Sequence, residues 1–367
     1  MINLSQGAFT HDQIINLLSF PHGAREVQYR IDVLRRGAVV ATADHHQCTY
    51  ECDSTRNAAY RASMVVNDNP MVDWTTDLLQ PVMLFAARNP LANFEFRLCP
   101  LRPVTVNYTV RNGVAARNVE AYDDLIWLEG NSIGEVLYIP RGTLYTAAIN
   151  SLLERGGFGA ANILPSPATI QTDREDWSED TDIITIANQL LEEMGYNKLT
   201  MGFDGIPTAA PYEPPGILNA RVQYTDSKAS ILLPELSVEA DTYKKTNRFI
   251  GVVANPDMEP LRYVFVNDDP ASPTSTINTG RTVTEYRTYD NVADFDALVT
   301  NVQRWAAETA RSYERVNVQT AIMPHHEVRE TVILDTADFA GICAETSWSI
   351  SDWSASGIMT HTLEVIR

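Results

Sequence analysis

The segment from His45 to Cys52 carries residue types that suit a zinc ion. His45, His46, Cys48 and Cys52 fall within eight positions, and imidazole with thiolate is a ligand set that zinc favours. In a strand, however, Cys48 and Cys52 would lie on one face about 13 Å apart at 3.3 Å per residue. No second cysteine pair follows at zinc-finger spacing. We therefore predict no metal site in this segment.

A second histidine-rich segment, His325-His326-Glu327, follows Pro324. It is not the His-Glu-x-x-His pattern, which places two imidazoles on one helix face around one ion. Adjacent residues in a strand or turn point to opposite sides. The segment is therefore predicted to be a proline-initiated hairpin corner with exposed histidines.

Six acids gather between Asp173 and Asp182. Paired carboxylates could serve acid–base catalysis or bind calcium, but the run lacks the glycine and the twelfth-position glutamate of an EF-hand loop. A helix is predicted from Thr181, and acids near a helix N-terminus stabilise it by about 0.3 to 1 kcal/mol each when exposed. We predict a solvated helix start.

An alternative interpretation makes the chain a cell-wall hydrolase or a sugar-binding adhesin. Its acid–base candidates are Asp173, Glu175 and Asp176, and its sugar platforms would be the tryptophans at positions 177, 348 and 353. Tryptophans in alternating strands are more often part of a core. No Gly-x-Ser-x-Gly motif, P-loop or catalytic cysteine context is present. We therefore predict no catalytic residue, no bound cofactor and no metal.

Alternating apolar residues predict the strands that must position these side chains. In the first third, we expect an N-terminal helix at 11–20, strands at 27–33, 38–42, 47–51, 59–66, 82–86 and 94–101, and a helix at 71–79. Asn112-Gly113 predicts a hairpin between 104–110 and 114–122, with further strands at 125–128 and 135–139. Helices are expected from Thr143, as N-cap, to Gly156 and at 181–194.

The last third is predicted to begin with strands at 229–236, 249–254 and 263–266. A polar loop and one amphipathic helix at 292–311 follow. The remaining strands are expected at 315–321, 328–334, 341–350 and 357–366.

The chain is strongly acidic. Its 367 residues contain 47 Asp and Glu against 28 Lys and Arg, a formal charge of -19. Phosphate neutralisation needs clustered basic residues, so we expect no specific nucleic-acid binding. Neither a secretory signal nor an apolar run of about 18 residues is recognisable, so we expect a soluble protein made in a cytoplasm without membrane insertion. The four cysteines are expected to stay reduced.

The order of the C-terminal segments resembles a known family. A strand ending at Val266, a polar loop to Gly280-Arg281, the helix at 292–311 and the Pro-His-His-Glu hairpin follow one another. Further matching segments are 30–37, 172–177, 255–258 and 345–350. In this order they resemble the baseplate (tail) hub proteins of bacteriophages and phage-tail-like particles, which are similar to the contractile-tail baseplate hub.

The resemblance implies an α+β, mainly β fold with two tail-tube-like antiparallel β-barrel modules and an inserted mixed α/β region. The expected limits are an N-terminal arm at 1–22, a first module at 23–105, the insertion at 106–240 and a second module at 241–367. It further implies a structural, non-enzymatic virion protein that forms a homotrimeric, pseudo-sixfold ring.

Such a ring would join the tail-tube protein to a spike or peptidoglycan-hydrolase tip and let DNA or the tape-measure protein pass. It would be assembled in the bacterial host cytoplasm and located at the tail tip or baseplate of the virion. Three chains of -19 each would carry -57, and we expect acids to line the lumen. A host-receptor adhesin is a third alternative.

Overall fold

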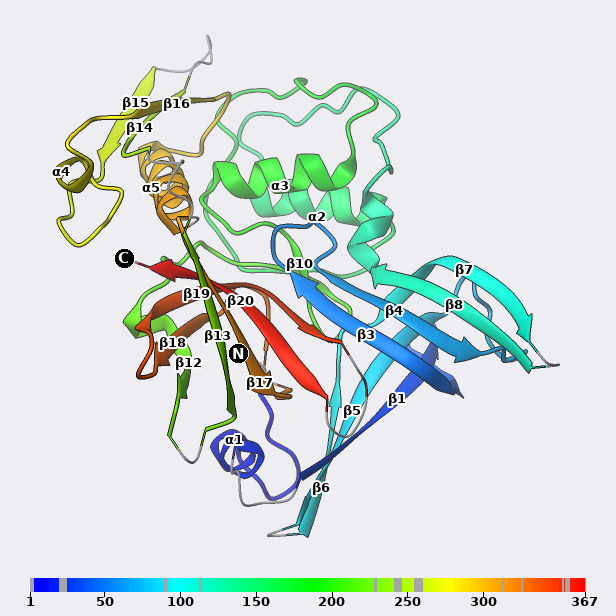
Figure 1. Cartoon of the computed structure of the whole chain (residues 1–367). Coiled ribbons are helices and arrows are strands. Elements are labelled where there is room, and N and C mark those ends of the chain that lie inside the picture. The colour runs from blue at the N-terminus through cyan, green and yellow to red at the C-terminus, as the bar shows by residue number, and fades with distance from the viewer. Residues whose placement is uncertain are drawn as a thin grey trace.

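The structure is a computed structural model that describes residues 3–19, 25–88, 91–111, 114–227, 230–240, 246–253, 260–311, 313–324, 326–351, 353 and 357–366. Figure 1 shows a strongly curved β layer with the helices α2, α3 and α5 gathered on one side of it. The Asn112-Gly113 turn and His325 lie outside the described residues, as does the side chain of His46.

The N-terminal third is a helix followed by eight strands. Helix α1 spans His11–Ser19. The strands are β1 (Arg25–Arg35), β2 (Ala38–Ala43), β3 (His45–Asp53), β4 (Tyr60–Asn67), β5 (Leu78–Arg88), β6 (Leu91–Arg97), β7 (Leu101–Arg111) and β8 (Val114–Asp123). Burial alternates along β4, as a strand with one face on the core requires.

The middle of the chain supplies most of the helical layer. Its elements are the 3-10 helix η1 (Asp124–Leu128), α2 (Tyr145–Arg155), β9 (Asn162–Ile163), α3 (Ile183–Glu193), β10 (Thr200–Met201), β11 (Pro207–Ala209) and the 3-10 helix η2 (Ile217–Asn219). Helices α2 and α3 pack against each other, and β10, β11 and β9 form a small separate sheet.

The C-terminal third returns to strands. It contains β12 (Ala220–Thr225), β13 (Leu232–Ala240), β14 (Arg248–Val253), β15 (Leu261–Val266), α4 (Thr276–Thr279), β16 (Thr284–Tyr289), α5 (Phe295–Arg311), β17 (Glu314–Ala321), β18 (Thr331–Asp335), β19 (Ala340–Ile350) and β20 (Ile358–Ile366). Helix α5 contacts the three-stranded sheet β15-β14-β16 on one side and β20 and α3 on the other.

One large sheet unites the two ends of the chain. Its strand order is β13-β17-β20-β19-β3-β4-β8-β7-β5-β1-β2, with β12, β18 and β6 branching from it, fourteen strands in the described residues. Strand β19 makes the link, because one part of it pairs with β18 and its end, Ser347–Ile350, pairs with β3. A β-bulge between Glu345 and Ser347 marks the change of neighbour.

Two apolar cores lie against this sheet. The larger one runs from α1 through the N-terminal strands to α2, α3 and α5. The smaller one is enclosed by the C-terminal strands and contains Tyr224, Val318, Leu334, Cys343 and Leu363 among others. The predicted mainly β architecture with a few helices is confirmed, and the mixed α/β segment lies in the middle of the chain as expected.

Several local predictions are wrong. Residues 71–77 form turns and 78–79 already belong to β5, because Asp73 accepts hydrogen bonds from Thr75 and Thr76, local contacts that compete with a helix. Residues 125–128 are helical, since Asp123 caps η1 through Leu125 N. Residues 135–139 form only an isolated bridge at Ile139.

Helix α2 begins one residue later than predicted. Its N-cap is Leu144, and the Thr143 hydroxyl donates to the Pro140 carbonyl instead of capping the helix. Strands β12 and β16 were not predicted. In the described part of the chain, no helix is long and apolar enough to cross a membrane.

Candidate functional site

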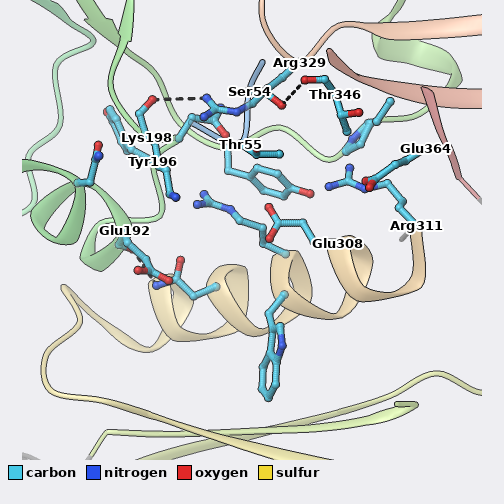
Figure 2. A pocket seen from close by; sticks show the side chains of 18 of the residues that line it. Ser54, Thr55, Glu192, Tyr196, Lys198, Glu308, Arg311, Arg329, Thr346 and Glu364 are labelled. Carbon is cyan, nitrogen blue, oxygen red and sulfur yellow. Dashed lines mark hydrogen bonds between the residues drawn. The ribbon is translucent and has the colours of Figure 1, made fainter. Parts of the chain in front are cut away.

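A cavity of about 780 Å³ opens where α3, α5, β19 and the loop after β3 meet. In Figure 2, Glu308 and Arg311 rise from helix α5 into this space, while Tyr196 and Lys198 approach from another wall and Arg329 from above. The walls therefore come from all three thirds of the chain.

Five cationic side chains line this cavity: Lys198, Arg287, Arg304, Arg311 and Arg329. They stand out because the chain as a whole carries a formal charge of -19. Arg287 is 3.9 Å from Glu192 and stacks on Trp305, with 4.7 Å from its guanidinium carbon to the ring centroid. No ion pair joins any of the other four cations to a carboxylate within the described residues.

Arg304 is fixed in place by neutral groups. Its Nη2 donates to the carbonyl oxygen of Gly195 at 3.2 Å, and its guanidinium carbon lies 4.3 Å from the Tyr212 ring centroid. Its Nε is buried and has no hydrogen-bond acceptor among the described residues, and the same holds for Arg311 Nε. Burial lowers the pKa of Arg304, because the charged form loses hydration.

Arg329 is held in an unusual backbone conformation. Its φ is 60°, in the left-handed region that non-glycine residues rarely adopt. Its Nη1 donates to the Lys198 carbonyl oxygen at 3.4 Å, a contact drawn in Figure 2. Burial and the nearby charge of Arg304 both lower the pKa of Arg329. The two guanidinium groups therefore repel each other across one cavity.

Four glutamates also line the cavity: Glu192, Glu308, Glu345 and Glu364. Two of them are engaged outside the basic group. Glu364 pairs with Arg315 at 3.4 Å, and Glu345 pairs with two histidines. The cavity therefore keeps a local excess of positive charge.

Behind the cavity, Glu345 joins two buried histidines. Glu345 Oε2 lies 3.1 Å from His326 Nδ1, and its Oε1 lies 2.5 Å from His361 Nδ1. The outer nitrogens also have partners, since His326 Nε2 is 2.7 Å from the Tyr224 hydroxyl and His361 Nε2 is 2.8 Å from the Thr320 hydroxyl. This chain of contacts crosses the interior between β12, β17, β19 and β20.

The charges in this cluster are coupled. Burial alone would raise the pKa of Glu345, but the two histidines lower it to about 2. Burial alone would lower the pKa of His326, but Glu345 and Glu330 raise it to about 10. His361 has a lowered pKa because of its burial. Glu345 and His326 thus form the ion pair, and neutral His361 donates to the same carboxylate.

Glu330 is the incomplete member of the cluster. Its Oε2 lies 3.2 Å from His326 Nδ1, yet neither of its oxygens has a well-aligned hydrogen bond within the described residues. The single Nδ1–H is directed to Glu345 instead. Burial raises the pKa of Glu330, which favours its neutral acid form.

The same cluster has the residue types of a metal site. His326, Glu345 and His361 offer ligand atoms within 4.8 Å of one another. Each of these atoms already has a hydrogen-bond partner, so the polar groups satisfy one another as they stand. The prediction of an exposed histidine at position 326 is wrong, because this side chain is 1% exposed.

The other residues considered as metal ligands lie apart from this site. Cys48 and Cys52 are free and buried in β3, and burial raises the pKa of each thiol. The His45 ring packs edge-on against Trp353. The structure brings none of these three residues into a common ligand set with the described His, Cys, Asp or Glu side chains.

The acid-rich run is anchored through its one arginine. Arg174 pairs with Asp176 at 2.6 Å and with Glu193 of α3 at 2.7 Å, and its guanidinium carbon lies 4.4 Å from the Trp177 ring centroid. Asp173 accepts a hydrogen bond from the Arg141 amide. The predicted helix start is present, with Asp182 as the N-cap of α3. The acid-rich run is not wholly solvated, however, because its Arg174 is buried.

The tryptophans proposed as sugar platforms are buried. Trp177, Trp348 and Trp353 all belong to the larger core. Trp348 stacks on Tyr50, and Trp353 stacks on Tyr29. Within this chain their faces are covered, which contradicts their use as exposed sugar-stacking surfaces.

Sequence reasoning missed the basic cavity altogether. Lys198, Arg304 and Arg329 are isolated in sequence and belong to different segments, so no local pattern groups them. The available signal was weak: basic residues are scarce in so acidic a chain, and only Arg304 of these three lies in a helix or strand.

Comparisons with known proteins identify the fold. The chain matches no protein-family model and no curated protein sequence. The structure resembles the tail protein from Neisseria meningitidis with a TM-score of 0.65 at 11% identity, covering 92% of this chain and 96% of that one. It resembles the prophage MuSo2 43 kDa tail protein from Shewanella oneidensis with a TM-score of 0.64 at 8% identity, covering 93% and 98%.

A third similar structure comes from a secretion system. This E. coli protein is a component of the type VI secretion system and is itself structurally similar to the T4 bacteriophage tail proteins gp27 and gp5. It superimposes with a TM-score of 0.51 at 10% identity, covering 91% of this chain and 77% of that one. The chain therefore has the fold of phage tail proteins, and the family resemblance seen in its sequence is confirmed at the level of fold.

Proposed function

We propose that this chain is a structural tail protein, the baseplate or tail hub of a bacteriophage or phage-tail-like particle. The observation that carries the proposal is the end-to-end match in fold with a Neisseria meningitidis tail protein, over 92% of this chain and 96% of that one. Agreement over nearly the full length of both chains means that the whole architecture is shared.

The hub position is supported by the third comparison, to a type VI secretion component that resembles T4 gp27 and gp5.

In our proposal three copies form a ring with two tube-like modules each. Strand pairing favours extending the first module to Asp123, because β7 and β8 pair with β5 and β4. It favours starting the second at Ala220, because β12 and β13 pair with β18 and β17.

Two edge strands support an assembly. Strands β2 and β13 lie at opposite ends of the sheet path, and they expose Val39 (47%) and Val238 (46%). Exposed edges with apolar side chains favour pairing with another chain. Contact between β13 of one copy and β2 of the next is head-to-tail, and such contacts form a ring when the rotation between successive copies closes.

The ring would connect the tail-tube protein to a spike or a peptidoglycan-hydrolase tip and would surround the passage used by DNA or the tape-measure protein. We propose an acid-lined lumen, consistent with the formal charge of -19 per chain and with the repulsion of DNA phosphates from acidic walls. The protein would act without catalysis. A hydrolase or sugar-binding role is disfavoured because Asp176 is paired with Arg174 and the candidate tryptophans are buried.

The location can be tested on particles from a cell that makes this protein. Gold-labelled antibodies against the chain should mark one end of the tail in electron micrographs. Labelling along the whole tail, or on the capsid, would contradict the proposal. Purified chain should also leave isolated cell walls intact, whereas lysis that is lost in the Asp176→Asn variant would establish the hydrolase.

A further inference from the structure

The basic cavity between α3, α5 and β19 contains buried hydrogen-bond donors that have no acceptor among the described residues. The Nε groups of Arg304 and Arg311 are buried and lack an acceptor among the described residues. A buried donor without an acceptor costs free energy. An incoming oxygen acceptor would remove that cost.

The cavity also has an excess of positive charge, which favours an anionic ligand. Arg304 and Arg329 face one space without a carboxylate at ion-pair distance in the described part of the chain. The left-handed backbone at Arg329 is a second, independent observation that points to a binding site. Strained conformations persist where the surrounding structure enforces them, and they are concentrated at binding sites. In Figure 2, Arg329, Arg311 and Lys198 reach the cavity from three separate segments.

The chemistry of the lining selects the ligand. Guanidinium groups match carboxylates as planar, two-pronged donors. Amide and hydroxyl side chains, among them Asn57, Asn188 and Thr185, complete the walls and can hydrogen-bond to peptide groups. A long polyanion such as DNA would meet the acidic surface of a chain with formal charge -19, whereas a short segment could enter the cavity alone.

We infer that this cavity binds an acidic segment of another polypeptide, with its carboxylates placed between Arg304, Arg311 and Arg329. This site goes beyond the proposed ring, and its binding does not require that the ring forms.

The test is calorimetric titration of the full chain with an end-capped pentaglutamate peptide. Peptide binding should weaken as sodium chloride rises, because ion pairs are screened. Arg329→Gln and Lys198→Gln should each raise the dissociation constant at least tenfold. Arg262→Gln is the matched control, since Arg262 is exposed on β15 away from the cavity, and it should bind like the unmodified chain.

Three results would overturn the inference. These are no binding at millimolar peptide, equal binding by folded Arg329→Gln and Lys198→Gln variants, and binding of inorganic phosphate or a five-nucleotide oligothymidylate as tight as that of the peptide. Circular dichroism establishes that each variant is folded. If Arg329→Gln disturbs its own loop, Lys198→Gln still tests the site, because it changes a different lining residue. Light scattering on the same samples measures the oligomeric state. Failure of the peptide-binding proposal can therefore be told apart from failure of the ring proposal.

Discussion

Arg174 and Glu193 form an ion pair of 2.7 Å with side chains only 1% and 5% exposed. The pair fastens the acid-rich loop to helix α3, and the Tyr145 hydroxyl of α2 donates to the same Glu193 oxygen at 3.1 Å. Arg174, and not the acids around it, therefore fixes the acid-rich loop to the helices α2 and α3.

Replacing Arg174 with methionine should destabilise the protein strongly. Glu193 would be left buried without its cation, and breaking a buried pair in this way typically costs about 3 to 5 kcal/mol. Urea unfolding followed by circular dichroism would measure the free energy of unfolding.

The matched control is Asp176→Asn on the other side of the same arginine. Asp176 is 40% exposed, and exposed pairs contribute about 0 to 1 kcal/mol. If Arg174→Met cost no more than Asp176→Asn, the buried pair would not be what anchors this loop.

Glu345→Gln should also destabilise the C-terminal strands. Its carboxylate faces two imidazole nitrogens, and removing the charge leaves His326 without a good counter-charge at a buried site. We expect a loss of about 3 kcal/mol or more in the free energy of unfolding, measured by urea unfolding.

Asp335→Asn, at an exposed position of β18, is the control and should change stability by about 0.5 kcal/mol at most. Because the candidate ligand atoms of His326, Glu345 and His361 already have hydrogen-bond partners, adding a chelator such as EDTA should leave the melting temperature unchanged. A drop in melting temperature on chelation, restored by zinc, would instead show that these residues hold an ion.

Asp123 should impose a pH dependence on stability. Burial raises its pKa from 3.8 to about 7, so between these values the folded state keeps a proton that the unfolded state releases. The contribution of Asp123 to stability therefore falls as pH rises from about 4 to about 7, by at most about 1.4 kcal/mol per pH unit.

The Asp123→Asn variant has no proton to release at this position. The stability of this variant relative to the unmodified chain should therefore rise steadily across the same pH range. Losing a backbone hydrogen bond from Tyr60 or Leu125 would lower its stability by the same amount at every pH and would not change this trend. Urea unfolding at pH 4.5, 6 and 7.5 measures the difference, and a gap that does not change with pH would contradict this assignment.

The sequence predicted elements best where one face is buried along the whole element. The alternation in β4 and β20 and the apolar stripe of α5 each identified their element. Turn residues that use their own side chains, such as Asp73, defeated the same reasoning because their hydrogen bonds are local and not periodic.

The candidate site was out of reach for a different reason. His326, Glu345 and His361 meet only because β19 and β20 pair and the chain before β18 folds over them. No spacing rule connects three such residues. The arginines at 304 and 329 converge through the same tertiary packing, so sequence patterns could show the strands but not the cavity between them.

A lysine on either free edge should weaken assembly. Val238→Lys on β13 or Val39→Lys on β2 would place a charge on the edge that we propose to pair, and lysine is a residue that blunts edge strands. We expect the dissociation constant of the oligomer to rise at least tenfold, measured by analytical ultracentrifugation. Val266→Lys, on the separate β15 sheet, should leave it unchanged, and equal effects of all three substitutions would argue against these edges as the contact.

The most direct test of the hub proposal is the mass of the purified chain by light scattering, with electron microscopy of the same sample. We predict about 123 kDa, three times the chain mass of 40.9 kDa, and rings of threefold symmetry with a central opening. A stable monomer that stays at 40.9 kDa even when mixed with the tail-tube protein would contradict the ring.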